Sequence, residues 1–408
     1  MSDTRHIVYV NEFFHPDICA SADVISEQLP RLLVRRPDLK ITVITGNRAW
    51  DDPDRIYPAE GDFRGVHVIR VPRPMVNRTS LMSRARGFAA FGRGAARAAR
   101  RLDRIDLVVG TTAPPQGGRV ARKIAEHHGC PFIYRVLDLY PDIVGALGRM
   151  SRKGPAYRVW KALDTGIMKR AAAIVAVCEP MTRRIAETRG VAFARLHTLH
   201  DGFDPDRLVP PDRNEFSEEH NPGRRFVVQY AGNMGLSHPF EAIVGAVQAL
   251  SDQKQMLFQF VGDGPQRSYL QAHNPTGNAQ LLGYQPADRL AEVLSAADVC
   301  LISQHPDVFD QAIPYKIYAT LAAGKPAVFI GDRRSEIADW LIESGGGLHV
   351  PSGDVKQLVR VLRDLASDRQ RVVQMGAAAR ALFDRRFHAD QVAEKWSRII
   401  DGALDASR

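Results

Sequence analysis

Residues 311–330, QAIPYKIYATLAAGKPAVFI, indicate a loop, then a helix, then a buried strand. Pro314 suits a first helical turn, because its missing N–H would have no partner there. Residues 316–323 combine good helix formers with apolar residues at helical spacing, and Gly324 is placed to end the helix. The apolar run 327–330 is typical of a parallel sheet that is covered on both faces. This order of elements predicts an α/β fold.

The same stretch contains a candidate anion site. A loop that leads into a helix presents backbone N–H groups, and Lys316 adds an ammonium beside them. Such an arrangement can hold a phosphate or a diphosphate. Alternatively, Lys316 is one solvated lysine among the 55 basic residues of the chain.

Length and composition predict a globular protein of two domains. At 408 residues the chain is too long for one ordinary core, so we expect two domains of roughly 200 residues. No apolar run reaches the ~18 residues of a membrane span, and no secretory signal is visible. The four cysteines lie far apart without metal-ligand spacing. We therefore expect a cytoplasmic protein with reduced thiols and no metal site.

The net charge of +9 indicates an anionic partner. Within residues 84–104, five arginines fall at intervals that place them along one helical face: Arg93, Arg97, Arg100, Arg101 and Arg104. Apolar residues lie nearby, namely Leu81, Met82, Phe88 and Phe91. We expect this helix to lie on an anionic membrane surface, which would make the protein peripheral at the inner face of the cell membrane. A solvated surface helix is the alternative. Nucleic acid is not expected, because no helix-turn-helix, zinc-finger or RNA-binding signature accompanies the charge.

Strand, loop and helix alternate along both halves of the chain, with a polar, proline-rich interruption between them. This rhythm predicts two doubly wound, Rossmann-like domains that face a cleft, over residues 1–203 and 204–385. Ligands of such sheets bind beyond the carboxyl ends of the strands. The loops that follow the strands are therefore the candidate site.

Two glycine-rich turns follow buried strands of the second half. They are YAGNMG at residues 230–235 and VGDGP at residues 261–265, where Gly232 and Gly262 allow close approach of the backbone to an anion. Together with the Lys316 loop, these turns favour a nucleotide-type ligand. No Walker motif is present and no G-x-G-x-x-G follows the first strand, which disfavours ATPases and dehydrogenases.

Polar side chains in the first half could act on an acceptor. Asp138 and Asp142 flank LYP after a strand, and either could serve as a general base or bind a hydroxyl-rich molecule. Asp142 could instead cap the next helix. His15, in the first loop, could touch a substrate or be a surface imidazole. The D-x-D sequence at residues 204–206 follows no strand, so it predicts a turn rather than a metal site.

A set of motifs runs nearly from end to end of the chain: FFHPD (13–17), DLYPDIVGALG (138–148), HDGFDPDRLVP (200–210), YAGNMG, VGDGP, YKIYATLAAGKPAV (315–328) and GGGLHVPSGD (345–354). With these motifs the chain resembles the family 4 (group 1) glycosyltransferases of GT-B architecture, in particular the branch that builds bacterial surface polysaccharides.

The resemblance implies that the second domain holds a nucleotide-sugar donor and that the first holds a lipid-linked or saccharide acceptor. A final helix, about residues 386–408, would cross back to the first domain. The implied catalytic residues are Asp138, facing the reacting hydroxyl, and Lys316, neutralising the diphosphate. The implied donor-binding residues are Gly232, Asn233, Met234, Gly262, Gln311, Tyr315 and Ile317, and the acceptor-binding residues are Phe14, His15 and Asp142. The resemblance also implies a UDP- or GDP-linked donor, retention of anomeric configuration, and no cofactor or metal.

Some positions depart from the family pattern. Gln311 and Ala319 stand where members carry two glutamates eight residues apart. Ser237 and His238 replace an arginine and a lysine, and Asp201 replaces an asparagine. Two alternatives therefore stay open: a GT-B epimerase or hydrolase that needs no acceptor, and a non-catalytic nucleotide-sugar-binding subunit.

Overall fold

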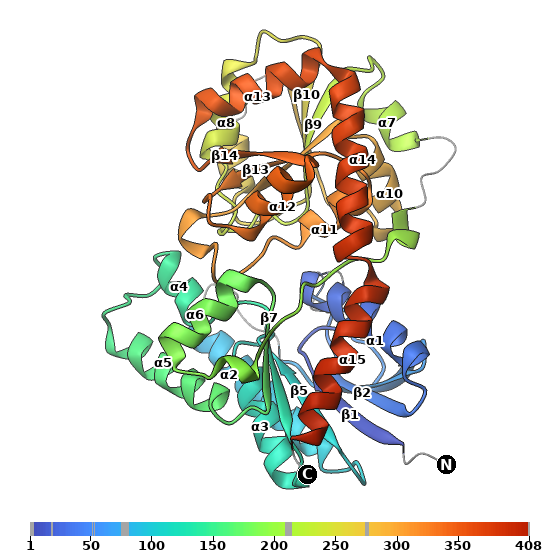
Figure 1. Ribbon diagram of the computed structural model, residues 1–408, viewed down its shortest axis with the longest axis vertical. Helices are drawn as coiled ribbons and strands as arrows, with labels where there is room; N and C mark the ends of the chain where they lie inside the picture. Colours follow the sequence, from blue (N-terminus) through green and yellow to red (C-terminus); the bar gives the residue numbers. More distant parts are fainter. Residues whose placement is uncertain are drawn as a thin grey trace. The chain divides into compact units, whose positions relative to one another are not determined.

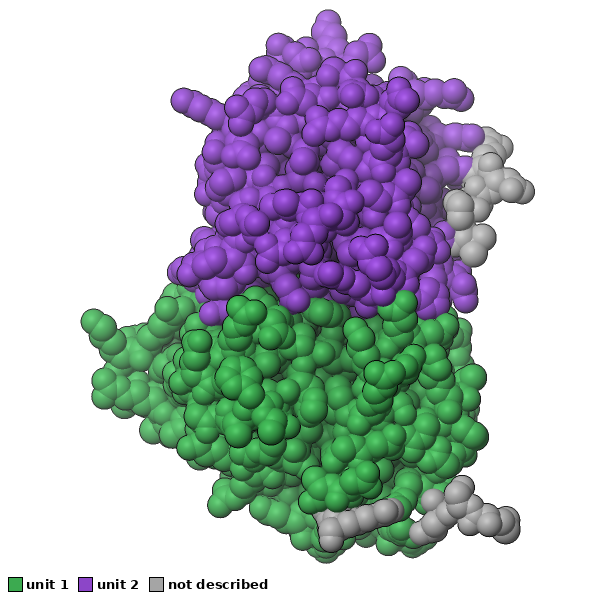
Figure 2. Space-filling view, in the orientation of Figure 1, with its two compact units in different colours: residues 1–201, 311–313, 389–408 green, residues 202–310, 314–388 purple. Residues whose placement is uncertain are grey.

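The computed structural model describes residues 4–17, 19–50, 52, 54–74, 81–208, 214–273 and 277–406. The chain forms two compact units (Figure 2). Unit 1 comprises residues 1–201, 311–313 and 389–408, and unit 2 comprises residues 202–310 and 314–388. Each unit is an α/β domain with its own sheet, which confirms the predicted fold class.

Unit 1 is built around an eight-stranded sheet (Figure 1). Its strands are β1 (Arg5–Val10), β2 (Leu39–Gly46), β3 (Glu60–Phe63), β4 (Val66–Val71), β5 (Leu107–Thr111), β6 (Phe132–Val136), β7 (Ala173–Ala176) and β8 (Leu196–Thr198). Their order is β3-β4-β2-β1-β5-β6-β7-β8, and only the β3–β4 pair is antiparallel. The chain therefore starts in the middle of the sheet and winds outward in both directions, as in a doubly wound fold.

Helices cover both faces of this sheet. They are α1 (Ala20–Arg35), α2 (Leu81–Ala99), α3 (Gly117–His128), α4 (Asp142–Ala146), α5 (Pro155–Met168), α6 (Glu179–Arg189) and α15 (Ala389–Asp405). Alternate residues of β1 belong to different cores: Val8 and Val10 pack with α2 and α3, whereas Ile7 and Tyr9 pack with α1 and α15. Burial of both faces explains why the strands are continuous apolar runs rather than alternating ones.

Unit 2 contains a six-stranded, wholly parallel sheet. Its strands are β9 (Phe226–Ala231), β10 (Met256–Val261), β11 (Ala279–Leu282), β12 (Val299–Ser303), β13 (Ala327–Gly331) and β14 (Gly347–Pro351), in the order β11-β10-β9-β12-β13-β14. The helices are α7 (Glu215–His220), α8 (Glu241–Ala249), α9 (Arg267–His273), α10 (Leu290–Ser295), α11 (Lys316–Ala322), α12 (Glu336–Ser344), α13 (Val355–Ser367) and α14 (Arg369–Arg386). Residues of α8 and α13 share one buried core with β9.

The stretch 311–330 has the predicted loop, helix and strand. Helix α11 begins at Lys316, and Gly324 follows its end in the left-handed conformation at φ 64°. Pro314 lies before the helix instead of in its first turn, and its carbonyl accepts the Ile317 N–H at 3.1 Å. In the linker, Asp204 accepts the Asp206 N–H at 3.0 Å, which confirms the turn expected there.

Helix α15 belongs to unit 1, which confirms that the C-terminal helix returns to the N-terminal domain. Trp396 is fully buried, and its indole lies edge-on to Tyr9 with ring centres 6.3 Å apart. Its Nε1–H donates to the Tyr9 hydroxyl at 2.5 Å. Ion pairs of Arg31 with Asp390 and of Arg36 with Asp401 link α1 to α15 at the surface.

The apolar residues of α2 face the protein interior. Phe91, Ala95 and Ala99 are fully buried in the core of unit 1, and Phe88 is half-buried. The side chains of Leu81 and Met82 lie outside the described residues. The prediction that Phe91 helps α2 to lie on a membrane is therefore wrong, because this side chain is used for packing. None of the helices within the described ranges has the length and apolarity to cross a bilayer.

Candidate functional site

The turn after β9 in unit 2 leaves two backbone N–H groups without an acceptor among the described residues. Gly232 has φ 115°, a conformation that favours glycine. The Gly232 and Met234 N–H groups donate to Val261 and Asp263 carbonyls, each at 2.8 Å. Within the described ranges, the N–H groups of Asn233 and Gly235 donate to no acceptor. The turn is thus held rigidly while two donors stay available, which is the arrangement of an anion-binding nest.

The turn after β10 packs closely against the turn after β9. A Cβ on Gly262 would lie 2.3 Å from the Gly232 carbonyl oxygen, and one on Gly264 would lie 2.7 Å from the Met234 oxygen. Both contacts are shorter than any side chain tolerates. Glycine is therefore required at both positions for the two turns to pack together.

Lys316 extends from α11 to this pair of turns. Its Nζ lies 3.5 Å from the ring centre of Tyr230 and 3.4 Å from the Asn233 carbonyl oxygen. The part of the chain that the structure describes places no carboxylate within ion-pair distance of this ammonium. Burial lowers the pKa of Lys316 well below its usual value. A bound anion would stabilise the charged form of this lysine, so the lysine is suited to hold one.

His238 lies close enough to this site to feel the Lys316 charge. Its Nδ1 is 2.7 Å from the Ser303 carbonyl oxygen, so Nδ1 carries the hydrogen and Nε2 is an acceptor. Burial and, next, the Lys316 charge lower the pKa of His238 to about 3. The imidazole is therefore neutral at physiological pH and adds no second positive charge beside Lys316.

The start of α11 contributes less than the sequence predicts. The Ile317 and Tyr318 N–H groups already donate to the carbonyls of Pro314 and Tyr315, both at 3.1 Å. The helix has only seven residues. The expectation that its N–H groups are available to an anion is corrected: the donors are the Lys316 ammonium and the N–H groups of the glycine turn.

The predicted donor residues divide into two groups. Gly232, Asn233, Gly262 and Lys316 come together around the two turns. Met234 and Ile317, in contrast, are fully buried, so their side chains cannot contact a nucleotide. Tyr315 is half-buried, with its ring near those of Phe203 and Tyr318.

Gln311 belongs to unit 1, although the resemblance implies that it binds the donor together with residues of the second domain. It is nearly fully buried, and its carbonyl accepts the Leu139 N–H at 2.8 Å. Its backbone therefore supports the loop after β6, which also carries Asp138.

Asp138 lies at the carboxyl end of β6. Its N–H and that of Leu137 donate to the Thr112 hydroxyl, at 3.1 and 2.9 Å. Burial, and secondarily the negative charge of Asp201, raise the pKa of Asp138 to about 6. Such a value is suited to a general base near neutral pH.

A buried polar group behind Asp138 was not found from the sequence. Arg135, in the middle of β6, is 1% exposed, and its guanidinium donates to Asp201 at 2.8 Å and to Gln28 at 2.5 Å. Its Cζ lies 5.5 Å from the ring centre of Trp396. An arginine within the buried strand FIYRV is the signal that could have revealed it, because a buried cation needs a partner.

Two of the predicted acceptor residues contact the ring of Phe63. Phe14 is 1% exposed and packs edge-on against Phe63, so it is a core residue and its assignment to the acceptor is corrected. His15 is exposed and stacks on the same ring, with centres 4.0 Å apart. Burial, then Arg70 and Arg64, lower the pKa of His15. The ring is therefore a neutral surface imidazole that a ligand can reach.

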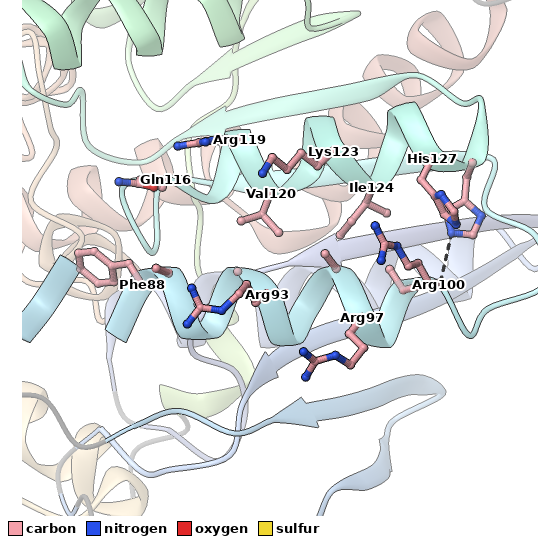
Figure 3. Close-up of a pocket in the computed structure, with 15 residues that line it drawn as sticks. Phe88, Arg93, Arg97, Arg100, Gln116, Arg119, Val120, Lys123, Ile124 and His127 are labelled. Carbon is pink, nitrogen blue, oxygen red and sulfur yellow. Dashed lines mark hydrogen bonds between the residues drawn. The ribbon is translucent and has the colours of Figure 1, made fainter. Parts of the chain in front are cut away.

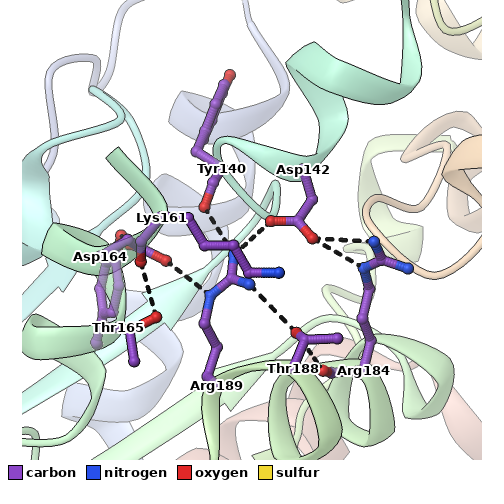
Figure 4. Close-up of polar contacts among 9 residues, drawn as sticks. Tyr140, Asp142, Lys161, Asp164, Thr165, Arg184, Thr188 and Arg189 are labelled. Atoms are coloured by element: carbon purple, nitrogen blue, oxygen red, sulfur yellow. Dashed lines mark hydrogen bonds and ion pairs between the residues drawn. The ribbon is translucent and has the colours of Figure 1, made fainter. Parts of the chain in front are cut away.

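Asp142 is fully buried in a network of charged side chains (Figure 4). It accepts hydrogen bonds from Arg189 and, at 2.9 Å, from Arg184. Although burial raises it, these two guanidinium groups hold the pKa of Asp142 below its usual value. Both sequence interpretations of this residue are corrected: Asp142 has no surface for an acceptor, and it is the first residue of α4 rather than its cap.

Two family models match the chain in succession. Residues 26–202 match "Glycosyl transferase 4-like domain", and residues 225–368 match "Glycosyl transferases group 1". The chain is 24% identical over 375 residues to the "Probable glycosyltransferase WbjE" of Pseudomonas aeruginosa, a match that covers 90% of this chain and 91% of that protein. It is 27% identical over 266 residues to the "Putative colanic acid biosynthesis glycosyl transferase WcaI" of Escherichia coli (strain K12), covering 61% and 62% respectively.

Solved structures share the fold. Sucrose-phosphate synthase from Thermosynechococcus elongatus superposes with a TM-score of 0.78 at 15% identity, covering 98% of this chain and 100% of that one. Anabaena Alr3699/HepE in complex with UDP-glucose gives 0.71 at 14% identity, covering 97% and 99%. With both family models matched and the glycine turns and Lys316 assembled, the chain belongs to the group 1 glycosyltransferases, nucleotide-sugar-dependent enzymes of GT-B architecture.

Proposed function

We propose that this enzyme transfers a sugar from a UDP- or GDP-linked donor to a lipid-linked or saccharide acceptor in the synthesis of a bacterial surface polysaccharide. The donor half of the proposal depends on one observation: the Lys316 ammonium, which has no carboxylate partner among the described residues, lies beside two glycine turns of unit 2 that pack together. The similarity to WcaI, whose name refers to colanic acid biosynthesis, supports the polysaccharide product.

The difficult step of this reaction is departure of the nucleotide diphosphate, because negative charge grows on it as the bond to the sugar breaks. Lys316 and the N–H groups of Asn233 and Gly235 would stabilise that charge. A desolvated ammonium interacts more strongly with an anion than a solvated one does. The proposal includes no metal and no cofactor, and retention of configuration at the transferred sugar.

Asp138 would act on the acceptor in unit 1. Its carboxylate would take the proton of the attacking hydroxyl, since its pKa of about 6 leaves it ionised at neutral pH yet basic enough to accept a proton. His15 would contact the acceptor through its exposed ring.

The substitution Lys316→Ala tests the donor site. We expect UDP or GDP to raise the Tm of the wild type and not of this variant, because its main charge contact is lost. Turnover should fall about 10²–10³-fold, as for removal of one oxyanion donor. The Tm without ligand should stay equal or rise, since the desolvated cation is removed.

Lys356→Ala is the matched control, because Lys356 is an exposed lysine of unit 2 on α13. It should behave as the wild type in both assays. Wild-type turnover in Lys316→Ala would contradict the proposal. Release of free sugar or an epimer without acceptor would favour a hydrolase or epimerase instead.

We also propose that the enzyme works in the cytoplasm, at the inner face of the membrane that carries its acceptor. Arg93, Arg97 and Arg100 are exposed along α2 and the turn after it. Because the apolar face of α2 is buried, this attachment would be electrostatic rather than by insertion. It should therefore weaken as salt concentration rises.

A further inference from the structure

Helices α2 and α3 of unit 1 enclose a cavity of about 550 Å³ (Figure 3). Small residues of α2, among them Gly92 and Ala96, line it. A Cβ on Gly92 would lie 3.0 Å from the Val120 Cγ2, so the helices are in close contact at this point. The long side chains on either side of the contact then surround an open space, which we call the α2–α3 groove.

The groove carries positive charge without a counter-charge. Among the described residues, five cations and no carboxylate line it: Arg93, Arg97, Arg100, Arg119 and Lys123. Across the described ranges, none of the five lies within ion-pair distance of an acidic residue. Arginines nearby are paired, as Arg104 is with Asp106 and Arg122 with Glu126. Like charges gathered in this way repel one another, and an anion between them would relieve the repulsion.

The walls of the groove are fixed before any ligand binds. Phe91 and Ala95 of α2, and Ile124 of α3, are buried in the core of unit 1. The His128 Nε2 also lies 3.1 Å from the Ala99 carbonyl oxygen, which joins the ends of the two helices. The cations therefore extend from a rigid surface, so little ordering is needed on binding.

One end of the groove lies close in sequence to the candidate acceptor site. Gln116, just before α3, lines the groove, and Thr112 in the same loop accepts the Asp138 N–H. Strands β5 and β6 are parallel neighbours, so the loops after them share one edge of the sheet. Gln116 and Asp138 therefore lie in loops at the same edge of the sheet.

We propose that the α2–α3 groove binds the phosphate groups of an anionic ligand that also has an apolar part. Guanidinium groups pair with phosphate oxygens through two parallel hydrogen bonds. Phe88, Val120 and Ile124 line the cavity between the cations and suit a hydrocarbon segment. The volume exceeds that of one phosphate and lies in the range of small-molecule pockets. The ligand is either the diphosphate of a lipid-linked acceptor, which rests on the proposed function, or a phospholipid headgroup.

Calorimetric titration with inorganic diphosphate tests the shared chemistry. Diphosphate can also bind at Lys316, so four proteins are compared: wild type, Lys316→Ala, the double variant Arg93→Ala with Lys123→Ala, and all three changes combined. We expect the wild type to bind diphosphate at two sites. Lys316→Ala and the double variant should each keep one site, and the triple variant should keep none. In the Lys316→Ala background, the groove changes should weaken binding at least tenfold.

Arg86→Ala is the matched control, because Arg86 is an exposed arginine of α2 outside the groove. It should leave the stoichiometry unchanged. Equal binding by the groove variant and the wild type would overturn the proposal, as would no binding to Lys316→Ala. The wild type could instead bind diphosphate at a single site that is lost in the groove variant but kept in Lys316→Ala. That result would support the groove proposal and overturn the proposed donor site.

Sedimentation with vesicles separates the two sources of phosphate. Phosphatidylcholine vesicles with and without phosphatidylglycerol are compared for wild type, Arg86→Ala and the groove variant. Binding that needs phosphatidylglycerol and is lost only in the groove variant assigns a phospholipid headgroup. Diphosphate binding in the groove without vesicle binding assigns the acceptor diphosphate. Absence of both overturns the proposal.

Discussion

Asp138 combines a position at the end of β6 with a pKa raised to about 6 by burial and by Asp201. If it takes the proton of the acceptor hydroxyl, it must be ionised to act. We therefore predict that kcat/KM rises with pH and reaches half its maximum near pH 6. Asp138→Asn should lower kcat by about 10²–10⁴-fold. Steady-state rates measured between pH 5 and 8 check both expectations.

The ionisation of Asp138 that raises activity with increasing pH lowers the stability of unit 1. A carboxyl whose pKa is raised on folding contributes stability that is present below its unfolded pKa and is lost as pH rises through about 6. At pH 8 the ionised, half-buried Asp138 thus destabilises unit 1. Asp138→Asn should have an equal or higher Tm than the wild type at pH 8. A lower Tm would assign the residue a structural role.

Asp142 is the contrasting carboxylate of the same loop. Removing it leaves Arg189 buried without its closest partner, a loss of about 3–5 kcal/mol for a buried pair. We predict that Asp142→Ala lowers the Tm by roughly 10 °C at pH 7 and leaves the acceptor KM unchanged.

The pH dependence of the Tm loss in Asp142→Ala tests whether the lost ion pair causes it. Since the pKa of Asp142 is held below 3.8, its contribution is present above that pH and lost as pH falls further. The Tm difference between variant and wild type should therefore shrink in acid. A raised KM with a normal Tm would restore Asp142 to the acceptor site.

Among the elements, the two glycine turns are the ones whose packing against each other builds the proposed donor site. A Cβ at position 262 would collide with the Gly232 carbonyl oxygen at 2.3 Å. We predict that Gly262→Ala separates the turns and lowers nucleotide affinity at least tenfold. Nucleotide titration by calorimetry measures this.

Gly277→Ala is the control for backbone strain. Gly277 also has positive φ, at 104°, yet a Cβ there would meet no atom of the described residues within 4 Å. Its substitution should lower the Tm slightly and leave nucleotide affinity unchanged. An equal loss of affinity in both variants would mean that strain, and not contact between the turns, is responsible.

At the scale of the whole molecule, unit 1 is completed by the C-terminal end of the chain. Trp396 of α15 packs on Tyr9 of β1 and under Arg135 of β6. Trp396→Ala should destabilise unit 1 by about 3–5 kcal/mol, the usual cost of such a truncation. Differential scanning calorimetry should show that unit 1 of this variant unfolds at a lower temperature than in the wild type.

Unit 2 has its own core, so nucleotide should still stabilise it in Trp396→Ala. Trp396→Phe, which keeps most of the apolar contact, is the milder comparison. An unchanged scan for Trp396→Ala would mean that α15 adds nothing to the stability of unit 1.

Much of the fold could be read from the sequence because the relevant signals are local. Apolar runs such as 327–330, helix ends at Gly129, Gly190 and Gly324, and the turn at residues 204–206 depend on neighbours in the chain. The glycine turns and Lys316 were also recognisable, since their spacing after strands fixes the edge of the sheet on which they lie.

The roles of buried side chains were decided only by the tertiary structure. Phe14, Phe91 and Ile317 look like residues of surfaces or sites in the sequence, and each is packed in a core. Asp138 and Asp142 are alike as residues in one loop, yet arginines 42 and 47 positions away neutralise only the second. The charge and accessibility of a group depend on what the folded chain brings beside it, and no local pattern carries that information.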